Sequence, residues 1–287
     1  MKPPPFRYLR ATSVEECLDV MTEHGDEAKI LAGGQSLVPL MNLRLARPSW
    51  VIDVNHVPGL DYIRTEGDVL CLGAMTRHRD VAASETVARA CPLLSQAAPM
   101  IGHPAIRNRG TIGGSLAHAD PAAELPCVAV ATNAEVVAAG RNGRRVIPAA
   151  EFFTGYFETA LDPAEMIVEV RFPLARPGEA WEFREFTRKS GDFALAAAGV
   201  GLAVSGGSVT RARIAVSGIA DRPLRATKTE EQLTGQPLND EAIAAAAEMV
   251  VELGGSEGQD GRDSAELASV LAGRALRAAA AQLGSAR

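Results

Sequence analysis

The chain has 287 residues, of which 47% are hydrophobic and 22% charged, and its 29 basic and 35 acidic side chains give a net charge of −6. This length and apolar content suffice for about two domains, so the fold requires no metal or disulfide to hold it. The excess of acidic side chains argues against a general nucleic-acid binder. No apolar run approaches the roughly 18 residues of a membrane span, and residues 1–5 lack the apolar segment of a secretory signal. We therefore expect a cytoplasmic protein.

The four cysteines stand singly along the chain, with no Cys-x-x-Cys pair and no short spacing to a histidine. They are Cys17, Cys71, Cys91 and Cys127. Such spacing is typical of small buried hydrophobic residues rather than of zinc, iron–sulfur or disulfide ligands. We expect no metal site in this chain.

Residues 1–57 have the pattern of a small α/β unit. Capping-box residues at 12–16 begin a helix that ends at His24, with Gly25 as its stop. The other expected elements are strands at 6–9, 28–32 and 50–54 and a short helix at 37–45. Strands and helices alternate here, which indicates a first subdomain.

Residues 58–175 are the second predicted unit. Its expected elements are strands at 60–64, 69–73, 134–137 and 166–170, helices at 76–88 and 92–100, and a helix or loop at 149–154. Residues 101–126 are rich in glycine, proline, histidine and asparagine and lack a helical period. Loops of this length inside a compact domain are usually functional or disordered, and because apolar residues are mixed into this one we expect a functional loop there.

Residues 176–287 are the third predicted unit, which follows a linker at 176–178. Its expected elements are strands at 182–187, 194–204 and 212–217 and helices at 240–253 and 264–283. The polar, glycine-rich segment 254–261 is expected to be mobile. The whole pattern predicts an α+β protein.

Two glycine-rich segments carry the candidate chemistry. Residues 32–37 pass from a strand through two glycines into a helix start, and residues 109–115 place two glycines between Thr111 and Ser115. Glycines let a ligand approach the backbone, and consecutive N–H groups at a helix start bind anions. One such pair is most often a tight turn, whereas two indicate a diphosphate-bearing ligand. Neither a Rossmann fingerprint nor a P-loop pattern occurs, so the residues alone predict a non-Rossmann cofactor site.

The sequence around these loops resembles the FAD-binding medium subunits of molybdenum hydroxylases. This family includes the flavin subunits of carbon monoxide dehydrogenase-like, nicotine dehydrogenase-like and xanthine dehydrogenase-like enzymes. The resemblance lies in residues 31–39, 42–46, 101–115, 119–126, 191–194, 262–267 and 274–276. It therefore covers nearly the whole chain.

The resemblance implies a vanillyl-alcohol-oxidase-type fold. Two α/β subdomains, residues 1–57 and 58–175, are expected to hold FAD between them. A C-terminal domain at 176–287 is expected to consist of a three-stranded antiparallel sheet and helices.

The resemblance also implies the cofactor-binding residues, and it implies no catalytic residue in this chain. The pyrophosphate is expected to contact the first loop, Ala32, Gly33, Gly34, Gln35, Ser36 and Leu37, and the second, Thr111, Ile112, Gly113, Gly114 and Ser115. Glu124 is expected beside the ribityl chain, Ile167 in the flavin region, and Phe193, often Tyr in carbon monoxide dehydrogenase-like members, over the isoalloxazine ring. The remaining expected contacts are Ile30, Leu31, Ile101, Asp120, Lys189 and Asp192.

Several of these residues have simpler alternative roles. Asp120 and Glu124 are better suited to recognising ribose hydroxyls, or to capping the N-terminus of a helix that starts at Leu125, than to acid–base catalysis. Lys189 would either contact the edge of the flavin or form a surface ion pair with Asp192, which is close to it in the sequence.

The implied activity is electron transfer. The resemblance implies that the electrons come from iron–sulfur clusters, and this chain has no iron–sulfur ligand pattern. The resemblance therefore implies that the clusters lie on a small partner subunit and the molybdopterin on a large one, in a dimer of heterotrimers. The flavin subunit would pass the electrons to NAD⁺, a quinone or oxygen. Gln35, where carbon monoxide dehydrogenases typically carry His, argues against carbon monoxide as the substrate. The alternatives are a self-contained flavin oxidoreductase and a non-redox assembly subunit.

Overall fold

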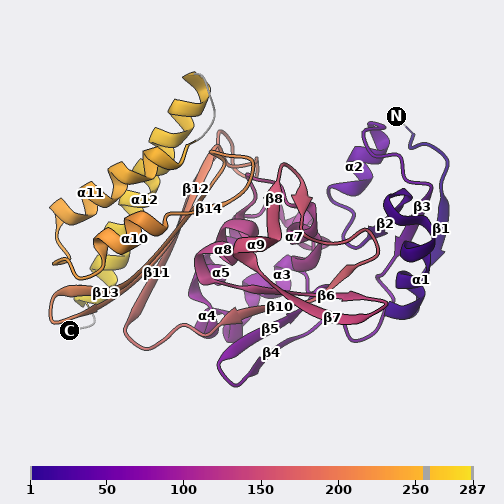
Figure 1. The fold of residues 1–287 in the computed structure, drawn as a ribbon, viewed down its shortest axis with the longest axis horizontal. Helices are drawn as coiled ribbons and strands as arrows, with labels where there is room; N and C mark the ends of the chain where they lie inside the picture. Colours follow the sequence, from indigo (N-terminus) through magenta and orange to yellow (C-terminus); the bar gives the residue numbers. More distant parts are fainter. Residues whose placement is uncertain (1, 255–258, 286–287) are drawn as a thin grey trace.

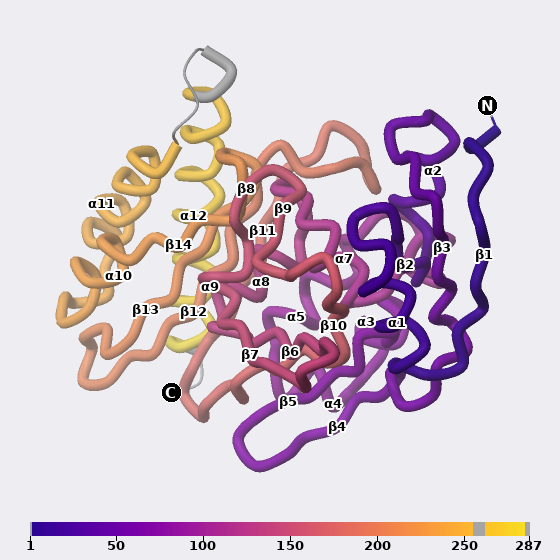
Figure 2. The backbone as a smooth tube through the Cα atoms, turned by 45° about the vertical axis from the view of Figure 1, so that its right-hand side comes forward, coloured from indigo at the N-terminus to yellow at the C-terminus, as the bar shows by residue number. Residues whose placement is uncertain are grey.

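Three large β-sheets lie in a row along the long axis of the molecule (Figure 1). The computed structural model describes residues 2–254 and 259–285, so half of the segment expected to be mobile, residues 255–258, lies outside the described residues. The N-terminal sheet and the C-terminal helices occupy opposite ends, and Figure 2 shows the same separation after a 45° turn. The helices of the middle of the chain fill the space between the sheets.

The N-terminal unit is a three-stranded parallel sheet in the order β1-β3-β2. Its elements are β1 (Arg7–Arg10), α1 (Val14–His24), a 3-10 turn (Gly25–Glu27), β2 (Ala28–Leu31), α2 (Leu37–Asn42) and β3 (Trp50–Asp53). The Ser13 hydroxyl accepts a hydrogen bond from the Glu16 N–H at 3.2 Å, and Gly25 ends α1 with a φ of 51°. Both ends of α1 are therefore where the sequence predicts them.

The central unit is a five-stranded antiparallel sheet with helices against it. The strands, in spatial order, are β4 (Ile63–Glu66), β5 (Val69–Gly73), β10 (Met166–Pro173), β6 (Glu135–Gly140) and β7 (Gly143–Pro148). The helices are α3 (His78–Ala83), α4 (Glu85–Ala90), α5 (Pro92–Ala97), a 3-10 turn (Ala98–Met100), α6 (Pro104–Arg107), α7 (Ile112–His118), α8 (Glu124–Thr132) and α9 (Ala149–Phe152). A small hairpin, β8 (Phe153–Gly155) and β9 (Glu158–Thr159), completes the unit.

Two predictions for this unit are wrong. Residues 101–126 are not one long loop, because they contain α6, α7 and the start of α8. All nine residues of α8 are buried, so the helix has no polar face to give the sequence a helical period. The helix expected at 76–88 is broken at Ser84, whose hydroxyl accepts from the Val87 N–H and starts a new helix.

The C-terminal unit is an antiparallel sheet of four strands, where three were expected. They are β11 (Glu179–Phe186), β12 (Ala196–Ser205), β13 (Ser208–Ser217) and β14 (Leu224–Arg225), in that order. The added strand pairs with Ala215 and Val216 and is two residues long, too short to show a strand period. The remaining elements are α10 (Thr227–Leu233), α11 (Asp240–Val250), a 3-10 turn (Val251–Leu253) and α12 (Gln259–Ser285). These helices cover one face of the sheet, and α5 and α8 pack on the other (Figure 1).

The hydrophobic cores run across the boundaries between the units. Trp181 and Phe183 of β11 belong to the same buried cluster as Leu93 and Leu94 of α5. On the other side, Val168 of β10 shares a cluster with the side chains of α1. The three units are therefore packed as one body through the central sheet.

All four cysteines are free and buried, as their spacing predicts. Over the two described ranges, no group of three or more His, Cys, Asp and Glu side chains is placed to hold a metal ion. In the same part of the chain, no helix has the length and apolar content needed to cross a membrane.

Candidate functional site

The two glycine loops meet at the seam between the N-terminal and central units. A Cβ atom placed on Gly33 would lie 2.4 Å from the Arg109 carbonyl oxygen and 2.8 Å from the Gly110 Cα atom. A Cβ on Gly114 would lie 3.8 Å from the Cβ atom of Ala32. Because residues 32–37 and 109–115 come from different units, only the tertiary fold brings them into contact. At Gly33 this contact leaves no room for a side chain.

The first loop presents a row of free backbone donors. The N–H groups of residues 33–37 have no hydrogen-bond partner among the described residues. Gly34 has a φ of 72°, a conformation that favours glycine, and the Gln35 side-chain amide donates to the Gly33 carbonyl at 3.0 Å. The side chain of Gln35 thus folds back on the loop and stiffens it. Consecutive free N–H groups ahead of a helix suit the oxygen atoms of a phosphate.

The second loop is fixed by hydrogen bonds to the segment that follows β5. The Gly113 N–H donates to the Ala74 carbonyl at 2.9 Å, and the Ile112 N–H donates to the Thr76 carbonyl at 3.0 Å. Thr111 is the N-cap of α7, and its hydroxyl accepts from the Gly114 N–H at 3.1 Å. The Ser115 hydroxyl has no partner within the described ranges, so it remains available to a ligand.

A polar bridge of two side chains joins the loops across the seam. The Asn55 side-chain amide donates to the Ala32 carbonyl at 2.9 Å, and its oxygen accepts from the Arg77 guanidinium at 2.6 Å. The same guanidinium donates to the Arg109 carbonyl. Asn55 and Arg77, which are hydrogen-bonded to each other, therefore each donate a hydrogen bond to a backbone carbonyl of one loop.

A group of buried carboxyl groups lies at the start of α8. Asp120 and Glu124 are 9% and 8% exposed, and the Asp120 carboxylate accepts from the Ala122 N–H at 2.9 Å. Burial, together with the smaller effect of the neighbouring Asp120 charge, raises the pKa of Glu124 to about 7. Burial also raises the pKa of Glu185 on β11 to about 7, with Glu124 as the second cause. Glu124 and Glu185 therefore share one buried environment.

That environment contains polar atoms without partners. Glu185 Oε2 and the hydroxyl of Ser217 are buried, and neither has a hydrogen-bond partner within the described part of the chain. Buried polar atoms in native proteins are nearly always hydrogen-bonded, so unpaired ones near a cofactor site indicate a polar ligand group.

The loop between β11 and β12 adds an exposed edge to the site. Lys189, Asp192 and Phe193 are exposed on this loop, and Phe193 is 68% exposed. A Cβ on Gly191 would lie 2.4 Å from the His103 ring, which places the loop against the segment that leads into the second glycine loop. Lys189 and Asp192 form no ion pair with each other among the described residues.

The other predicted contacts are less exposed to a ligand. Ile101 and Ile167 belong to the buried core, at 8% and 5% exposure. Ile30 and Leu31 lie on β2, which leads into the first loop. Of these four residues, Leu31 lies against the first loop, since its side chain would be 3.0 Å from a Cβ atom on Gly34.

The sequence reasoning missed Asn55, Arg77 and Glu185. Asn55 follows β3 and Arg77 precedes α3, and each occurs in the sequence as an ordinary polar residue beside an element. Their contact spans 22 residues of chain and depends on the pairing of the units. Only the strand-end position of Asn55, next to a sheet edge where ligands often bind, is a sequence signal.

The fold and this site define a class: an α+β protein that holds a diphosphate-bearing dinucleotide at the seam between two units without a Rossmann motif. The residues fit FAD, since the free N–H groups and hydroxyls of the loops suit its pyrophosphate. The family described as the FAD binding domain in molybdopterin dehydrogenase matches residues 4–175, and the CO dehydrogenase flavoprotein C-terminal domain matches residues 181–283. The chain belongs to the family of FAD-binding medium subunits of molybdenum hydroxylases, which are subunits of oxidoreductases.

Individual relatives are similar over most of their length. The 6-hydroxypseudooxynicotine dehydrogenase complex subunit alpha of Paenarthrobacter nicotinovorans is 47% identical over 88% of this chain and 86% of its own. The carbon monoxide dehydrogenase medium chain of Hydrogenophaga pseudoflava is 40% identical over 97% of each chain. The solved structure of the enzyme from that organism gives a TM-score of 0.95 over 98% of this chain and 99% of that one. Quinoline 2-oxidoreductase from Pseudomonas putida 86, at 36% identity, gives a TM-score of 0.93 over 99% of each chain.

Proposed function

We propose that this chain carries FAD, takes electrons from iron–sulfur clusters on a partner subunit and passes them to an external acceptor. The row of free N–H groups at residues 33–37, facing the second glycine loop across the seam, is the observation that carries this proposal. Bound FAD supplies the redox chemistry, because it exchanges electrons singly or in pairs. The chain's own residues bind the cofactor, orient it and control which molecules reach it.

The proposed contacts divide by part of the cofactor. Residues 32–37 and 111–115 would hold the pyrophosphate by N–H groups and hydroxyls. Asp120 and Glu124 would face the sugar-like ribityl chain, where a buried carboxyl group is a strong hydrogen-bonding partner. Phe193, with Lys189 and Asp192 on the same exposed loop, would lie at the isoalloxazine ring. Ile30, Leu31, Ile101 and Ile167 would form the apolar support.

The proposed domain organisation follows the three sheets. We place the boundaries at residues 57 and 175, so that each unit contains one of the three large sheets. The two family matches, which divide the chain between residues 175 and 181, support the second boundary. The vanillyl-alcohol-oxidase type of fold belongs to the same proposal.

The partners are proposed from the relatives. Their names describe a medium chain or a subunit of a dehydrogenase complex. We expect a large molybdopterin subunit and a small iron–sulfur subunit, assembled in the cytoplasm as a dimer of heterotrimers. The substrate would be chosen in the large subunit, outside this chain.

A co-purification experiment tests the function. The chain is purified alone and with its two expected partners, and the visible spectrum and donor oxidation are recorded. We expect a yellow protein in both preparations and donor oxidation only in the three-subunit preparation. Turnover by the yellow chain alone would identify a self-contained oxidoreductase, and a colourless chain in both preparations would identify an assembly subunit.

A further inference from the structure

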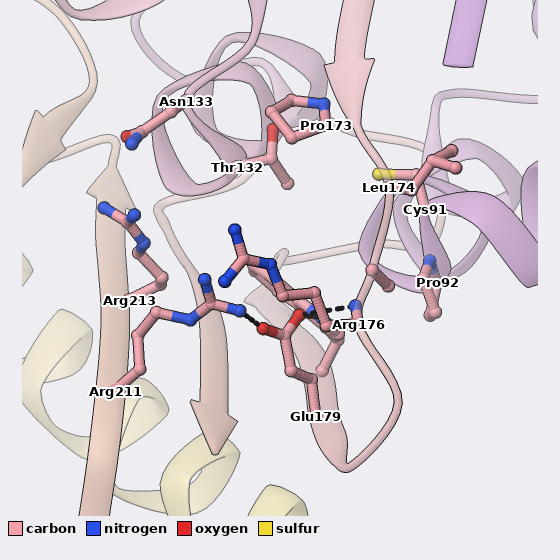
Figure 3. A pocket seen from close by; sticks show the side chains of 12 residues that line it. Cys91, Pro92, Thr132, Asn133, Pro173, Leu174, Arg176, Glu179, Arg211 and Arg213 are labelled. Atoms are coloured by element: carbon pink, nitrogen blue, oxygen red, sulfur yellow. Dashed lines mark hydrogen bonds and ion pairs between the residues drawn. The ribbon is translucent and has the colours of Figure 1, made fainter. Parts of the chain in front are cut away.

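A cavity that is not lined by the glycine loops contains three arginines. It has a volume of about 210 Å³ and lies where α5, the end of α8 and the segment after β10 meet β11 and β13. Arg176, Arg211 and Arg213 line it (Figure 3). In this view Arg211 reaches Glu179, whereas the guanidinium of Arg213 extends toward Asn133.

The charges in this cavity do not balance. Glu179 is the single carboxylate among its lining residues, so three guanidinium charges against one carboxylate leave two positive charges. The Glu179 side chain is 4% exposed and forms an ion pair with Arg211. Its Oε2 atom accepts from the Arg176 backbone N–H at 3.0 Å and from the Trp181 indole at 3.3 Å. The one carboxylate of the cavity is therefore already paired with Arg211 and accepts two further hydrogen bonds, while its charge balances only one of the three guanidinium groups.

Two of the guanidinium groups have no acceptor. In the described part of the chain, the side chains of Arg176 and Arg213 form no hydrogen bond or ion pair. The nearby Glu230 carboxylate is already paired with Arg225. Burial lowers the pKa of Arg213, and the positive charges of Arg225, Arg211 and Arg176 lower it further. Such an arrangement is stabilised by an anion.

Asn133 adds a polar donor to the same cavity. Its side-chain oxygen accepts from the Arg225 guanidinium at 2.5 Å. This contact fixes which end of the amide is the acceptor, and it leaves the NH₂ group without a partner among the described residues. The cavity thus presents guanidinium and amide donors and hardly any acceptor.

We propose that this cavity binds a small phosphate-class oxyanion. Planar guanidinium groups match the oxygen pairs of phosphate, and a dianion balances the two excess charges. The volume is below the roughly 300–1,000 Å³ of pockets for drug-sized ligands, so the ligand is inorganic phosphate or the terminal phosphate of a small metabolite.

This site is separate from the cofactor cradle. Glu124 begins α8 and Thr132, which lines the cavity, ends it, so the two sites are about 12 Å apart along the helix at 1.5 Å per residue. The cavity joins the central unit to the C-terminal sheet. A bound phosphate therefore ties Arg213 on β13 to Arg176 on the segment after β10 and stabilises this junction.

Calorimetric titration of inorganic phosphate into the flavin-loaded complex tests the proposal. We expect saturable binding, at least tenfold weaker in Arg213→Gln and unchanged in Arg144→Gln, which alters an exposed arginine on β7. Phosphate should also raise the melting temperature of the wild type and of Arg144→Gln but not of Arg213→Gln. Arg176→Gln, which changes an exposed side chain, gives the same test if Arg213→Gln fails to fold.

Further measurements separate the possible sources and artefacts. Equal flavin absorbance in all variants shows that the cofactor site is intact. A loss of phosphate binding in a variant is then caused by the change in the arginine cavity. Tighter binding of glycerol phosphate than of inorganic phosphate identifies a metabolite as the source, and the reverse order identifies the free ion. No saturable phosphate binding by the wild type, equal affinity in Arg213→Gln, or binding of succinate in place of phosphate overturns the proposal.

Discussion

At the scale of single residues, the site depends on a position where no side chain fits. Gly33 lies so close to the Arg109 carbonyl that the two glycine loops touch backbone to backbone. This contact, rather than a set of large side chains, fixes the distance between the loops. A cofactor held mainly by backbone groups is consistent with the low aromatic content of 5%.

Gly33→Ala should weaken flavin binding by about tenfold or more. The new methyl group would lie 2.4 Å from a carbonyl oxygen, so the loops must separate, and overpacking of this kind costs about 1–3 kcal/mol. Flavin retention is measured by the ratio of absorbance at the flavin and protein bands after gel filtration. Gly284→Ala is the matched control, because nothing lies within 4 Å of the Cβ added there. Equal flavin content in the two variants would contradict the packing argument.

Glu124 makes stability depend on pH. Its pKa is about 7 in the folded chain and near 4.5 when exposed, so the unfolded state loses this proton first as pH rises. The contribution of the protonated group is fully present below pH 4.5 and is lost as pH rises to about 7. Glu124→Gln should therefore raise the free energy of unfolding at pH 8 by up to roughly 3 kcal/mol, with a gain that shrinks toward pH 5.

Urea unfolding of the flavin-free chain at pH 5 and pH 8 measures this effect. Glu151→Gln, which alters an exposed glutamate on α9, is the control and should show no difference between the two pH values. A Glu124→Gln variant with the same gain at both pH values would show that the ionised carboxyl group is not the cause.

At the scale of elements, a buried ion pair connects α10 and β14 to the end of α8. The Glu230 carboxylate accepts from the Ile214 N–H at 2.6 Å and from Arg225 at 3.0 Å, and Arg225 donates to the Val130 carbonyl at 3.0 Å. The side chains of Arg225 and Glu230 are 13% and 11% exposed. The short strand β14 is thus held by the side-chain contacts of Arg225 as well as by its two backbone pairs with β13.

Glu230→Ala should lower the free energy of unfolding by about 3–5 kcal/mol. It leaves the Arg225 charge buried without its partner and removes the acceptor of the Ile214 N–H. Urea unfolding measures the loss. Glu231→Ala changes the exposed neighbour in the same helix and should stay within about 0.5 kcal/mol of the wild type. Comparable losses in both variants would mean that the helix itself, and not the ion pair, is responsible.

The elements that the sequence predicted well are those with polar boundaries. Helix α1 has a serine cap and a glycine stop, and β5 lies between turn residues, so their ends are visible locally. Helix α8 was predicted only as a helix start near Leu125, because every residue in it is buried. Strand β7 was missed because most of its residues are exposed at a sheet edge. Local pattern fails where burial is complete or absent, since periodicity arises from a half-buried element.

For the site, the sequence indicated both glycine loops and the carboxyl group of Glu124. It did not indicate the bridge between the loops, because Asn55 and Arg77 acquire their roles only when β3 and the segment after β5 lie side by side. The arginine cavity has the same origin, since its three arginines come from β13 and from the segment between β10 and β11.

At the scale of the whole molecule, the central unit depends on the C-terminal sheet. Trp181 and Phe183 cover α5, and Ala197 and Ala215 complete the same cluster. Removal of the third unit would therefore expose Leu93, Leu94 and much of α8 to water. The boundary near residue 175 separates sheets but does not separate cores.

A fragment of residues 1–175 should consequently fail to fold cooperatively. Its far-ultraviolet circular dichroism should lack a sharp thermal transition, and it should bind the dye ANS, which reports exposed apolar surface. The full chain measured in parallel provides the reference. A cooperative transition in the fragment would show that the first two units form an independent core.

The Asn55–Arg77 bridge has a kinetic consequence. The cofactor contacts that we propose come from both units, and this pair of side chains hydrogen-bonds a backbone carbonyl of each loop, so it should hold the two loops together around a bound cofactor. Loss of the bridge should then speed release of the cofactor without removing any contact that either loop makes to it.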